Sequence, residues 1–342
     1  MSFDALSWSA LPRLGVFLLI GGLGGALYVY AVWRERSFSA AARKLFVSQP
    51  ALSAAVKKAE AELGLPIFDR TCTPLQLTDA GKAYIESAEQ VFRIQRDLSR
   101  YCHDLAGLES GTLSLGGTNF FASCFLPAMI QAFNQKYPQI QLTVTESDSA
   151  DLYQKLSQDA LDIIVDSGTC DAALYDIVPF YTDHLLLAVP VGNPIHSRFP
   201  ACCLTRQDVI DGRHLEPEVP IVPLPEFADV DFLLLGKGND MYRRSRGLFQ
   251  SAGITPRVRL YLNQLMTAFH MARQGLGATF LTDTLVSLSL PTDRLLYYRL
   301  SGHLAVRETF LAMQHKGYRT KAMAGFLASS LALYGQMPAE RL

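Results

Sequence analysis

The chain has 342 residues, of which 49% are hydrophobic and 18% are charged, and its formal net charge is −1. This length and apolar content exclude a mainly disordered protein and allow two or three domains, because domains of about 100 to 150 residues are the commonest. The small net charge does not exclude a nucleic-acid partner, because binding depends on local potential.

The chain begins with an apolar run. Residues 14–33 carry no charged side chain and follow Arg13, so by length they qualify as a membrane span or a signal segment. The five glycines of the run lower its helix propensity and weaken both interpretations. If the segment is native, its stretch from Val16 to Ile20 needs cover from a partner, a lipid or the rest of the protein.

Two short helices separated by a break are predicted next. Ser39 is a candidate N-cap of the first helix, and Ser48 of the second, which has Pro50 in its first turn. The positions predicted to face inward are Ala42, Leu45 and Phe46 in the first helix and Leu52, Ala55, Val56, Ala59 and Leu63 in the second. The second helix then directs these residues outward: Gln49, Ser53, Ala54, Lys57 and Lys58.

A family resemblance rests on several short segments in fixed order. They are Phe38, the Ala-Ala-Arg-Lys-Leu run ending at Leu45, Val47 to Ser53, Glu62 to Gly64, Phe68 to Arg70 and Leu77 to Gly81. Together they closely resemble the winged helix-turn-helix of LysR-type transcriptional regulators. Residues 26–33 align with the first helix of that module, and one helix cannot serve both a membrane and a protein core. The expected DNA-binding domain is therefore 26–81, preceded by an atypical apolar extension over 1–25.

The resemblance and the outward positions together predict the contacts with double-stranded DNA. Gln49 and Ser53 are expected to read base edges, and the residues expected to hold phosphates are Arg43, Lys57, Lys58 and Arg70. Ser39, Ser48 and Pro50 complete the predicted interface. Between Arg34 and Lys82 there are eight basic and five acidic side chains, a modest positive surplus.

Two departures from the family pattern remove positive charge from the predicted interface. Ala54 stands where the family usually has a basic residue, and the wing Thr71 to Gln76 has no basic residue at all. DNA affinity is therefore expected to be low, or to depend more on the remaining polar and basic positions.

A long helix is predicted to follow, capped by Thr78 and ending at about Leu108. It has an apolar stripe, and pairing with the same helix of a second subunit would bury that stripe. The resemblance implies this role, so residues 82–110 are interpreted as a linker and dimerisation helix of a homodimer or homotetramer. The alternative is a helix packed on its own effector domain.

From residue 111 onward, strands alternate with helices, which is typical of a parallel α/β sheet. Strands are expected at 112–116, 140–145, 160–166, 185–190, 221–224, 232–235, 257–262 and 277–281, and helices at 122–137, 149–158, 242–252, 265–275 and 320–334. From Leu295 the chain is expected to rejoin the first unit through residues 304–314. This order resembles the two-lobed, periplasmic-binding-protein-like effector domain of the same family. Lobe I is expected to comprise residues 111–179 and 284–342, and lobe II residues 180–283.

In such folds a small molecule binds at the carboxyl ends of the strands, near helix N-termini that favour anions. The residues expected to bind the effector are Thr118, Asn119, Phe120, Ser147, Asp166, Asn263 and Thr279. The hydroxyls of Thr118, Ser147 and Thr279 suit a carboxylate, so the expected effector is a carboxylate-bearing metabolite.

The six cysteines form no C-x-x-C pair and no histidine lies at metal-ligand spacing, so neither a zinc site nor a disulfide scaffold is expected. No G-x-S-x-G, H-E-x-x-H or P-loop motif is present, so we expect no enzymatic activity, catalytic residue or cofactor.

The expected function is a cytoplasmic, effector-controlled transcriptional regulator, with RNA polymerase as a further candidate partner. The alternatives are a membrane-associated sensor of the same family and a solute-binding protein with weak DNA binding.

Overall fold

The structure is a computed structural model that describes residues 22–72, 74–105 and 111–335. These residues form two compact units whose boundary falls between Cys102 and His103, within helix α5 (Asp79–Leu105). The predicted extension over residues 1–25 lies largely outside the described residues. In the described ranges, no helix combines the length and the apolar character needed to cross a membrane.

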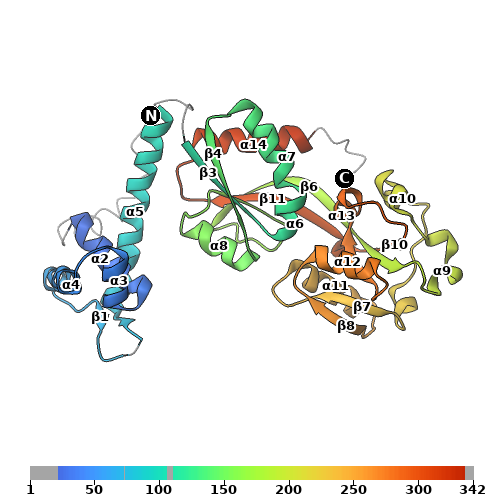
Figure 1. Ribbon diagram of the computed structural model, residues 1–342, viewed down its shortest axis with the longest axis horizontal. Helices are drawn as coiled ribbons and strands as arrows, with labels where there is room; N and C mark the ends of the chain where they lie inside the picture. The colour runs from blue at the N-terminus through green and yellow to red at the C-terminus, as the bar shows by residue number, and fades with distance from the viewer. Residues whose placement is uncertain (1–21, 73, 106–110, 336–342) are drawn as a thin grey trace. The chain divides into compact units, whose positions relative to one another are not determined.

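The first unit is a helical module with a small two-stranded wing (Figure 1). Its elements are α2 (Gly22–Glu35), α3 (Phe38–Lys44), α4 (Gln49–Leu63), β1 (Phe68–Asp69), β2 (Gln76–Leu77) and α5 (Asp79–Leu105). Its core combines residues of α2, α3, α4 and α5, including Val29, Ala42, Leu52, Val56 and Ala88. The helix-turn-helix and wing predicted from the sequence are therefore present.

The start of α4 agrees with the prediction, whereas the start of α3 does not. The Ser48 hydroxyl caps α4 by accepting the Ala51 N–H at 3.3 Å, with Pro50 in the first turn. Helix α3 starts two residues earlier than expected for a Ser39 cap, because Ser37 caps it by accepting the Ala40 N–H at 3.3 Å. Ser39 is an exposed residue inside α3.

Phe46 was predicted to face inward and instead is 96% exposed. It lies in the turn between α3 and α4 with a φ of 55°, a left-handed conformation that few side chains adopt. The chain reverses at this residue, so the helical spacing that suggested an inward position ends before it, at Lys44.

Thr78 caps α5 as predicted, since its hydroxyl accepts the Gly81 N–H at 2.9 Å. Gly81 is required there by close packing: a Cβ at this position would lie 2.0 Å from the Ile67 carbonyl oxygen. The wing and the long helix are joined at this point, because the Thr78 N–H also donates to that carbonyl oxygen at 3.0 Å.

The second unit is an α/β structure. Its strands are β3 (Gly111–Gly117), β4 (Ile140–Glu146), β5 (Ile163–Asp166), β6 (Tyr175–Pro190), β7 (Asp231–Leu235), β8 (Arg257–Leu262), β9 (Thr279–Thr282), β10 (Leu295–Arg299) and β11 (Val306–Gln314). Its α-helices are α6 (Asn119–Cys124), α7 (Leu126–Lys136), α8 (Ser149–Ser157), α9 (Ile195–Arg198), α10 (Arg206–Ile210), α11 (Asp240–Ser251), α12 (Leu265–Arg273), α13 (Asp283–Leu288) and α14 (Lys321–Tyr334). Short 3-10 turns η1 (Pro200–Cys202), η2 (Arg213–Leu215), η3 (Leu224–Phe227) and η4 (His303–Ala305) lie between them.

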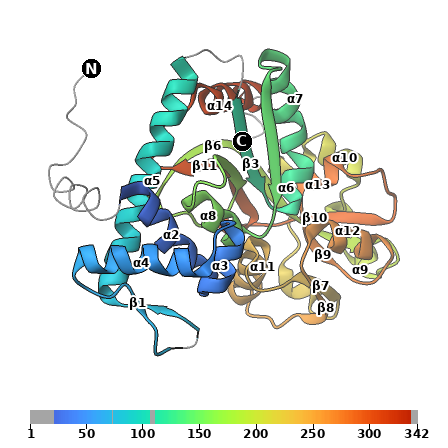
Figure 2. The same ribbon diagram turned by 60° about the vertical axis from the view of Figure 1, so that its left-hand side comes forward.

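The long strand β6 connects two halves of this unit. Its first part pairs antiparallel with β11, next to β5, β3 and β4, and its second part pairs with β9 and β10. Strand β3 is parallel to β4 and β5, and β7 is parallel to β8, so the predicted parallel pairing holds in both halves. Helices α7 and α14 lie on one face of the first half and α8 lies on the other (Figures 1 and 2).

Three sequence predictions need correction. Strand β10 pairs with the same end of β6 as β9 does, so the return to the first half falls at β11 rather than at residue 284. No strand forms over 221–224, where Pro220, Pro223 and Pro225 remove the N–H groups that a strand needs. The single helix expected over 122–137 is two helices broken at Phe125, where α7 begins with a proline in its first turn.

Candidate functional site

The outward face of α4 carries the residues predicted to meet DNA. Gln49, Lys57 and Lys58 are exposed and Ser53 is half-buried, whereas Leu52, Val56 and Ala59 of the same helix are buried. Ser39, Arg43, Ser48 and Pro50 are also exposed. One helix therefore presents a polar face to solvent, which is the arrangement that a recognition helix needs to enter a major groove.

The basic side chains of this face differ in how much of their charge is already neutralised. Among the residues that the structure describes, neither Arg43 nor Lys57 forms an ion pair, whereas Lys58 Nζ lies 3.9 Å from Glu62 Oε1. The Arg70 guanidinium donates to Glu60 at 2.9 Å and lies over the ring of Phe38. Lys57 and Arg43 thus have the most available charge.

The wing tip is organised around a carboxylate. Asp69 accepts hydrogen bonds from the Thr71 N–H at 2.9 Å and from the Thr71 hydroxyl at 2.6 Å. These bonds lower the pKa of Asp69 and favour its negative form. The wing therefore presents a negative charge where β1 ends and its loop begins and, in its described part beyond Arg70, no positive one.

The second unit contains a cleft of about 680 Å³ where the carboxyl ends of its parallel strands meet. Its lining residues are Thr118, Phe120, Phe121, Glu146 to Ala150, Asp166, Ser167, Gly236 to Met241, Asn263 to Leu265 and Arg307. They lie at or just after the carboxyl ends of β3, β4, β5, β7 and β8, apart from Arg307, which lies within β11. Both halves of the unit therefore contribute to one cleft.

Four helices begin at this cleft. Asp148 and Asn239 cap α8 and α11 with their side chains, accepting backbone N–H groups at 2.9 Å in each case. Thr118 and Gln264 occupy the same position before α6 and α12 but make no capping bond with their side chains. The first N–H groups of α6 and α12 are thus left for other acceptors.

The structure brings five of the seven predicted effector residues to the cleft wall: Thr118, Phe120, Ser147, Asp166 and Asn263. The other two lie elsewhere. Asn119 donates from Nδ2 to Glu146 at 3.0 Å, and the buried Thr279 hydroxyl donates to the Leu233 carbonyl at 2.8 Å. Thr279 faces the neighbouring strand rather than the cleft, because it lies within β9 and not after its end.

Two polar atoms at the cleft have no protein partner in the described part of the chain: Asp166 Oδ2 and Ser167 Oγ. The other oxygen of Asp166 accepts the Ser167 N–H at 2.8 Å and the Ser149 hydroxyl at 3.3 Å. Burial raises the pKa of Asp166. A ligand that donates a hydrogen bond would therefore find a buried acceptor here.

The cleft also holds opposing charges. Lys237 and Arg307 are the basic lining residues, and the acidic ones are Glu146, Asp148, Asp166 and Asp240. Three of these carboxylates already accept hydrogen bonds from the protein. Glu146 accepts from Asn119 Nδ2, Asp148 accepts a backbone N–H at the start of α8, and Asp240 accepts from Arg244 Nε at 2.6 Å. Asp166 is the carboxylate that keeps an oxygen available.

Arg307 is a cleft residue that the sequence analysis missed. It is 3% exposed, and its guanidinium lies 4.8 Å from the ring centre of Phe120 and 5.4 Å from that of Phe121. It pairs with Asp183, its direct cross-strand partner on β6. Arg307 is buried between the exposed Val306 and Glu308 of β11, a placement that the sequence itself does not signal.

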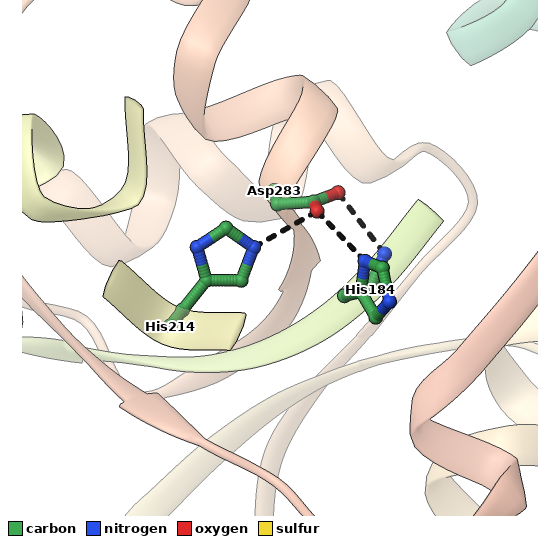
Figure 3. A group of neighbouring side chains, drawn as sticks. All are labelled: His184, His214 and Asp283. Atoms are coloured by element: carbon green, nitrogen blue, oxygen red, sulfur yellow. Dashed lines mark hydrogen bonds and ion pairs between the residues drawn. The ribbon is translucent and has the colours of Figure 1, made fainter. Parts of the chain in front are cut away.

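A group of three ionisable side chains lies near the middle of β6 (Figure 3). Asp283 Oδ2 is 3.1 Å from His184 Nδ1 and 3.0 Å from His214 Nε2. His184 ends the part of β6 that pairs with β11, and Leu185 begins the part that pairs with β9. The group therefore lies where the two halves of the unit join.

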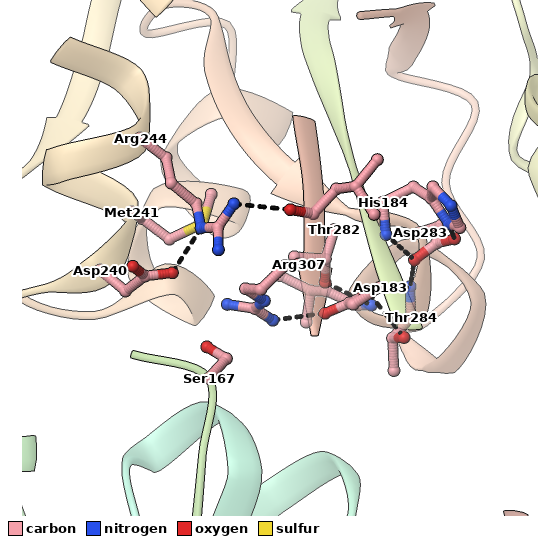
Figure 4. A network of polar contacts seen from close by, with 12 residues as sticks. Ser167, Asp183, His184, Asp240, Met241, Arg244, Thr282, Asp283, Thr284 and Arg307 are labelled. Carbon is pink, nitrogen blue, oxygen red and sulfur yellow. Dashed lines mark hydrogen bonds and ion pairs between the residues drawn. The ribbon is translucent and has the colours of Figure 1, made fainter. Parts of the chain in front are cut away.

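Hydrogen bonds connect this group to the cleft (Figure 4). Asp283 Oδ1 accepts the Thr284 N–H at 2.8 Å, and the Thr284 hydroxyl donates to Asp183 at 2.8 Å. Asp183 is fully buried and in turn holds Arg307. Two residues, Thr284 and Asp183, thus link Asp283 to Arg307 at the cleft.

Two family models match this chain. The model described as bacterial regulatory helix-turn-helix protein, lysR family, matches residues 26–82, and the model described as LysR substrate binding domain matches residues 106–333. The chain is 29% identical to YcgK of Bacillus subtilis, an uncharacterised helix-turn-helix-type transcriptional regulator, over 252 residues. These cover 74% of this chain and 77% of that protein.

Solved structures share the fold. A full-length OxyR variant from Pseudomonas aeruginosa superposes with a TM-score of 0.64 at 22% identity, covering 90% of this chain and 94% of the other. Full-length CbnR in complex with its target DNA superposes with a TM-score of 0.56 at 19% identity, covering 91% and 99%.

Proposed function

The chain belongs to the LysR family of bacterial transcriptional regulators, and we propose that a small polar metabolite in the cleft controls its action on DNA. It is a transcriptional regulator that combines a helix-turn-helix DNA-binding domain with a substrate-binding domain. The observation that carries the proposal is the cleft. Its lining includes two helix N-termini without a side-chain capping bond and the buried carboxylate of Asp166, whose Oδ2 has no hydrogen-bond partner among the described residues.

The chemistry of the cleft supports a hydroxylated carboxylate as the effector. The N-termini of α6 and α12, from the two halves of the unit, favour a carboxylate beside Thr118 and Gln264. Asp166 Oδ2 then needs a donor, which a hydroxyl group of the same molecule supplies. A compound that has only the carboxylate leaves this buried oxygen unpaired and binds more weakly.

We propose that the DNA-binding domain comprises residues 26–81, the linker and dimerisation segment residues 82–110, and the effector domain residues 111–342. The exposed apolar side chains of α5, Ile94, Leu98, Tyr101 and Leu105, follow one another at intervals of four, three and four residues. This spacing is that of a coiled-coil seam, which supports a homodimer, or a tetramer built from dimers. CbnR binds its target DNA as a full-length protein of the same fold, which supports DNA as the partner. A DNA partner supports a cytoplasmic location.

A mobility-shift assay tests the proposal, using the duplex beside the protein's own coding region and a panel of carboxylic acids with and without hydroxyl groups. We expect a hydroxy acid to change DNA binding at a lower concentration than its deoxy analogue. Thr118→Val should lose this response while binding DNA normally. Thr112→Val is the matched control, because Thr112 is an exposed residue at the start of β3, the strand whose end Thr118 follows.

The other outcomes are distinct. A protein that binds the acids but never retards a duplex would be a solute-binding protein. Recovery of the protein in the membrane fraction of cells would support the membrane-associated alternative, whose apolar run over 16–20 lies outside the described residues. Equal responses of the two threonine variants would refute the assignment of the cleft.

A further inference from the structure

His184, His214 and Asp283 form a compact set of metal-ligand atoms. The three donor atoms all lie within 4.8 Å of one another. They come from three separate segments, namely β6, the turn η2 and the start of α13. The side chains are 17%, 4% and 10% exposed, so the set is almost entirely enclosed.

The carboxylate of Asp283 is oriented by the backbone. Its Oδ1 accepts the His184 N–H at 3.0 Å and the Thr284 N–H at 2.8 Å. This leaves Oδ2 to face both imidazoles. Ligands of bound metals are commonly fixed in this way by hydrogen bonds from outside the coordination sphere.

We propose that His184 Nδ1, His214 Nε2 and Asp283 Oδ2 bind a divalent transition metal of the zinc class. Zinc binds imidazole nitrogen and carboxylate oxygen at about 2.0 to 2.2 Å in tetrahedral sites, which places neighbouring ligand atoms roughly 3.3 to 3.6 Å apart. The two nitrogen-to-oxygen distances of 3.0 and 3.1 Å require only a small outward movement. Two imidazoles with one carboxylate favour zinc or a similar ion over magnesium or calcium, which prefer oxygen ligands.

The fourth coordination position has room for water. His214 and Asp283 line a separate cavity of about 320 Å³, together with Cys124, Tyr181 and Tyr334. When the ion is on Nε2, the His214 proton is on Nδ1, which is buried and has no protein partner in the described ranges.

Metal at this site would fasten the junction between the two halves of the effector domain. Asp283 is linked through Thr284 and Asp183 to Arg307 at the cleft, so the ion would also restrict the movement of the Arg307 side chain. The proposal does not depend on the identity of the effector or on DNA binding.

Metal titration of the untagged, chelator-treated full-length protein tests the proposal. Zn²⁺ is added in a calorimeter, and Co²⁺ is added as a probe whose visible absorption reports nitrogen and oxygen ligation with low coordination number. We expect one equivalent of Zn²⁺ per chain. His214→Gln should weaken Zn²⁺ binding by more than about 100-fold, since the loss even of a partner outside the coordination sphere costs ~10- to 100-fold.

His315→Gln is the matched control, because His315 Nδ1 lies 2.8 Å from Asp176 in an exposed pair that, among the residues that the structure describes, belongs to no such group of three. It should retain the full Zn²⁺ affinity and the Co²⁺ spectrum. If His214→Gln does not fold, as judged by circular dichroism, the more exposed His184→Gln takes its place. Absence of the Co²⁺ bands, or equal Zn²⁺ binding by the His214 or His184 variant and the His315 variant, would show a hydrogen-bonded cluster without metal and overturn the proposal.

Discussion

Replacing Lys57 with alanine tests how this regulator holds DNA. Lys57 is exposed on the outward face of α4, one and two helical turns after Ser53 and Gln49, and forms no ion pair among the described residues. A lysine in this position is suited to a phosphate, whose neutralisation releases a counterion. Its removal should weaken binding to every duplex about equally, because a phosphate contact carries no sequence information.

The magnitude follows from the salt dependence of binding. Each phosphate contact contributes about 0.9 to the slope of log affinity against log salt, so a dimer that loses two contacts loses roughly 1.8. Between about 50 and 200 mM salt, the affinity of the variant should then fall about 12-fold less than that of the parent protein. Fluorescence anisotropy with a specific and a scrambled duplex measures both quantities.

Lys58→Ala is the matched control, because Lys58 is the adjacent lysine and is partly neutralised by Glu62 at 3.9 Å. Its slope should change less than that of Lys57→Ala. Neither substitution should alter the melting temperature, since both side chains are exposed and alanine has the highest helix propensity. A loss confined to one base position, or an unchanged slope, would refute the phosphate role.

Two further substitutions test the packing and the electrostatics. Gly81→Ala should destabilise the DNA-binding unit by ~1–3 kcal/mol or more, because the new Cβ meets the Ile67 carbonyl oxygen at 2.0 Å. In thermal melts, Gly24→Ala, whose Cβ meets nothing within 4 Å, should not destabilise, and equal effects of the two would contradict the packing argument. Burial raises the pKa of Asp166, so the folded state holds the carboxyl proton more tightly than the unfolded state. The contribution of Asp166 to folding stability is therefore most favourable below the ordinary carboxyl pKa of about 4, and it is lost as pH rises through the raised pKa. Asp166→Asn should therefore raise the melting temperature at pH 7 and leave it nearly unchanged near pH 4, and an equal shift at both pH values would contradict this.

The DNA-binding half could be predicted from the sequence because its signals are local. The Ser48 cap, Pro50 in the first turn and the stripe through Leu52, Val56 and Ala59 lie within a dozen residues. The errors at Ser39 and Phe46 are also local. Ser37, the preceding serine, caps α3 in place of Ser39, and the turn after α3 exposes Phe46. Helical spacing predicts which face is buried only as long as the helix continues.

The cleft was only partly predictable. The alternation of elements indicates Thr118 and Ser147, which follow a strand and precede a helix, and Asp166, which ends a strand, because parallel strands end at the same edge of a sheet. Thr279 has a similar local sequence but lies inside β9 and donates to the neighbouring strand. The strand predicted over 277–281 already contained Thr279, so the error was to expect the side chain of a residue inside a strand to face the cleft.

The sequence by itself determined the family, the helix-turn-helix and the alternating α/β order, since each depends on residues close together along the chain. Only the tertiary structure brought Arg307 to Asp183 and gathered His184, His214 and Asp283 at one point of β6. The three residues of that group are separated by 30 and 69 positions, so no spacing rule for metal ligands could connect them. Contacts of this kind arise from strand register and from the path of the chain between the two halves, which local patterns do not encode.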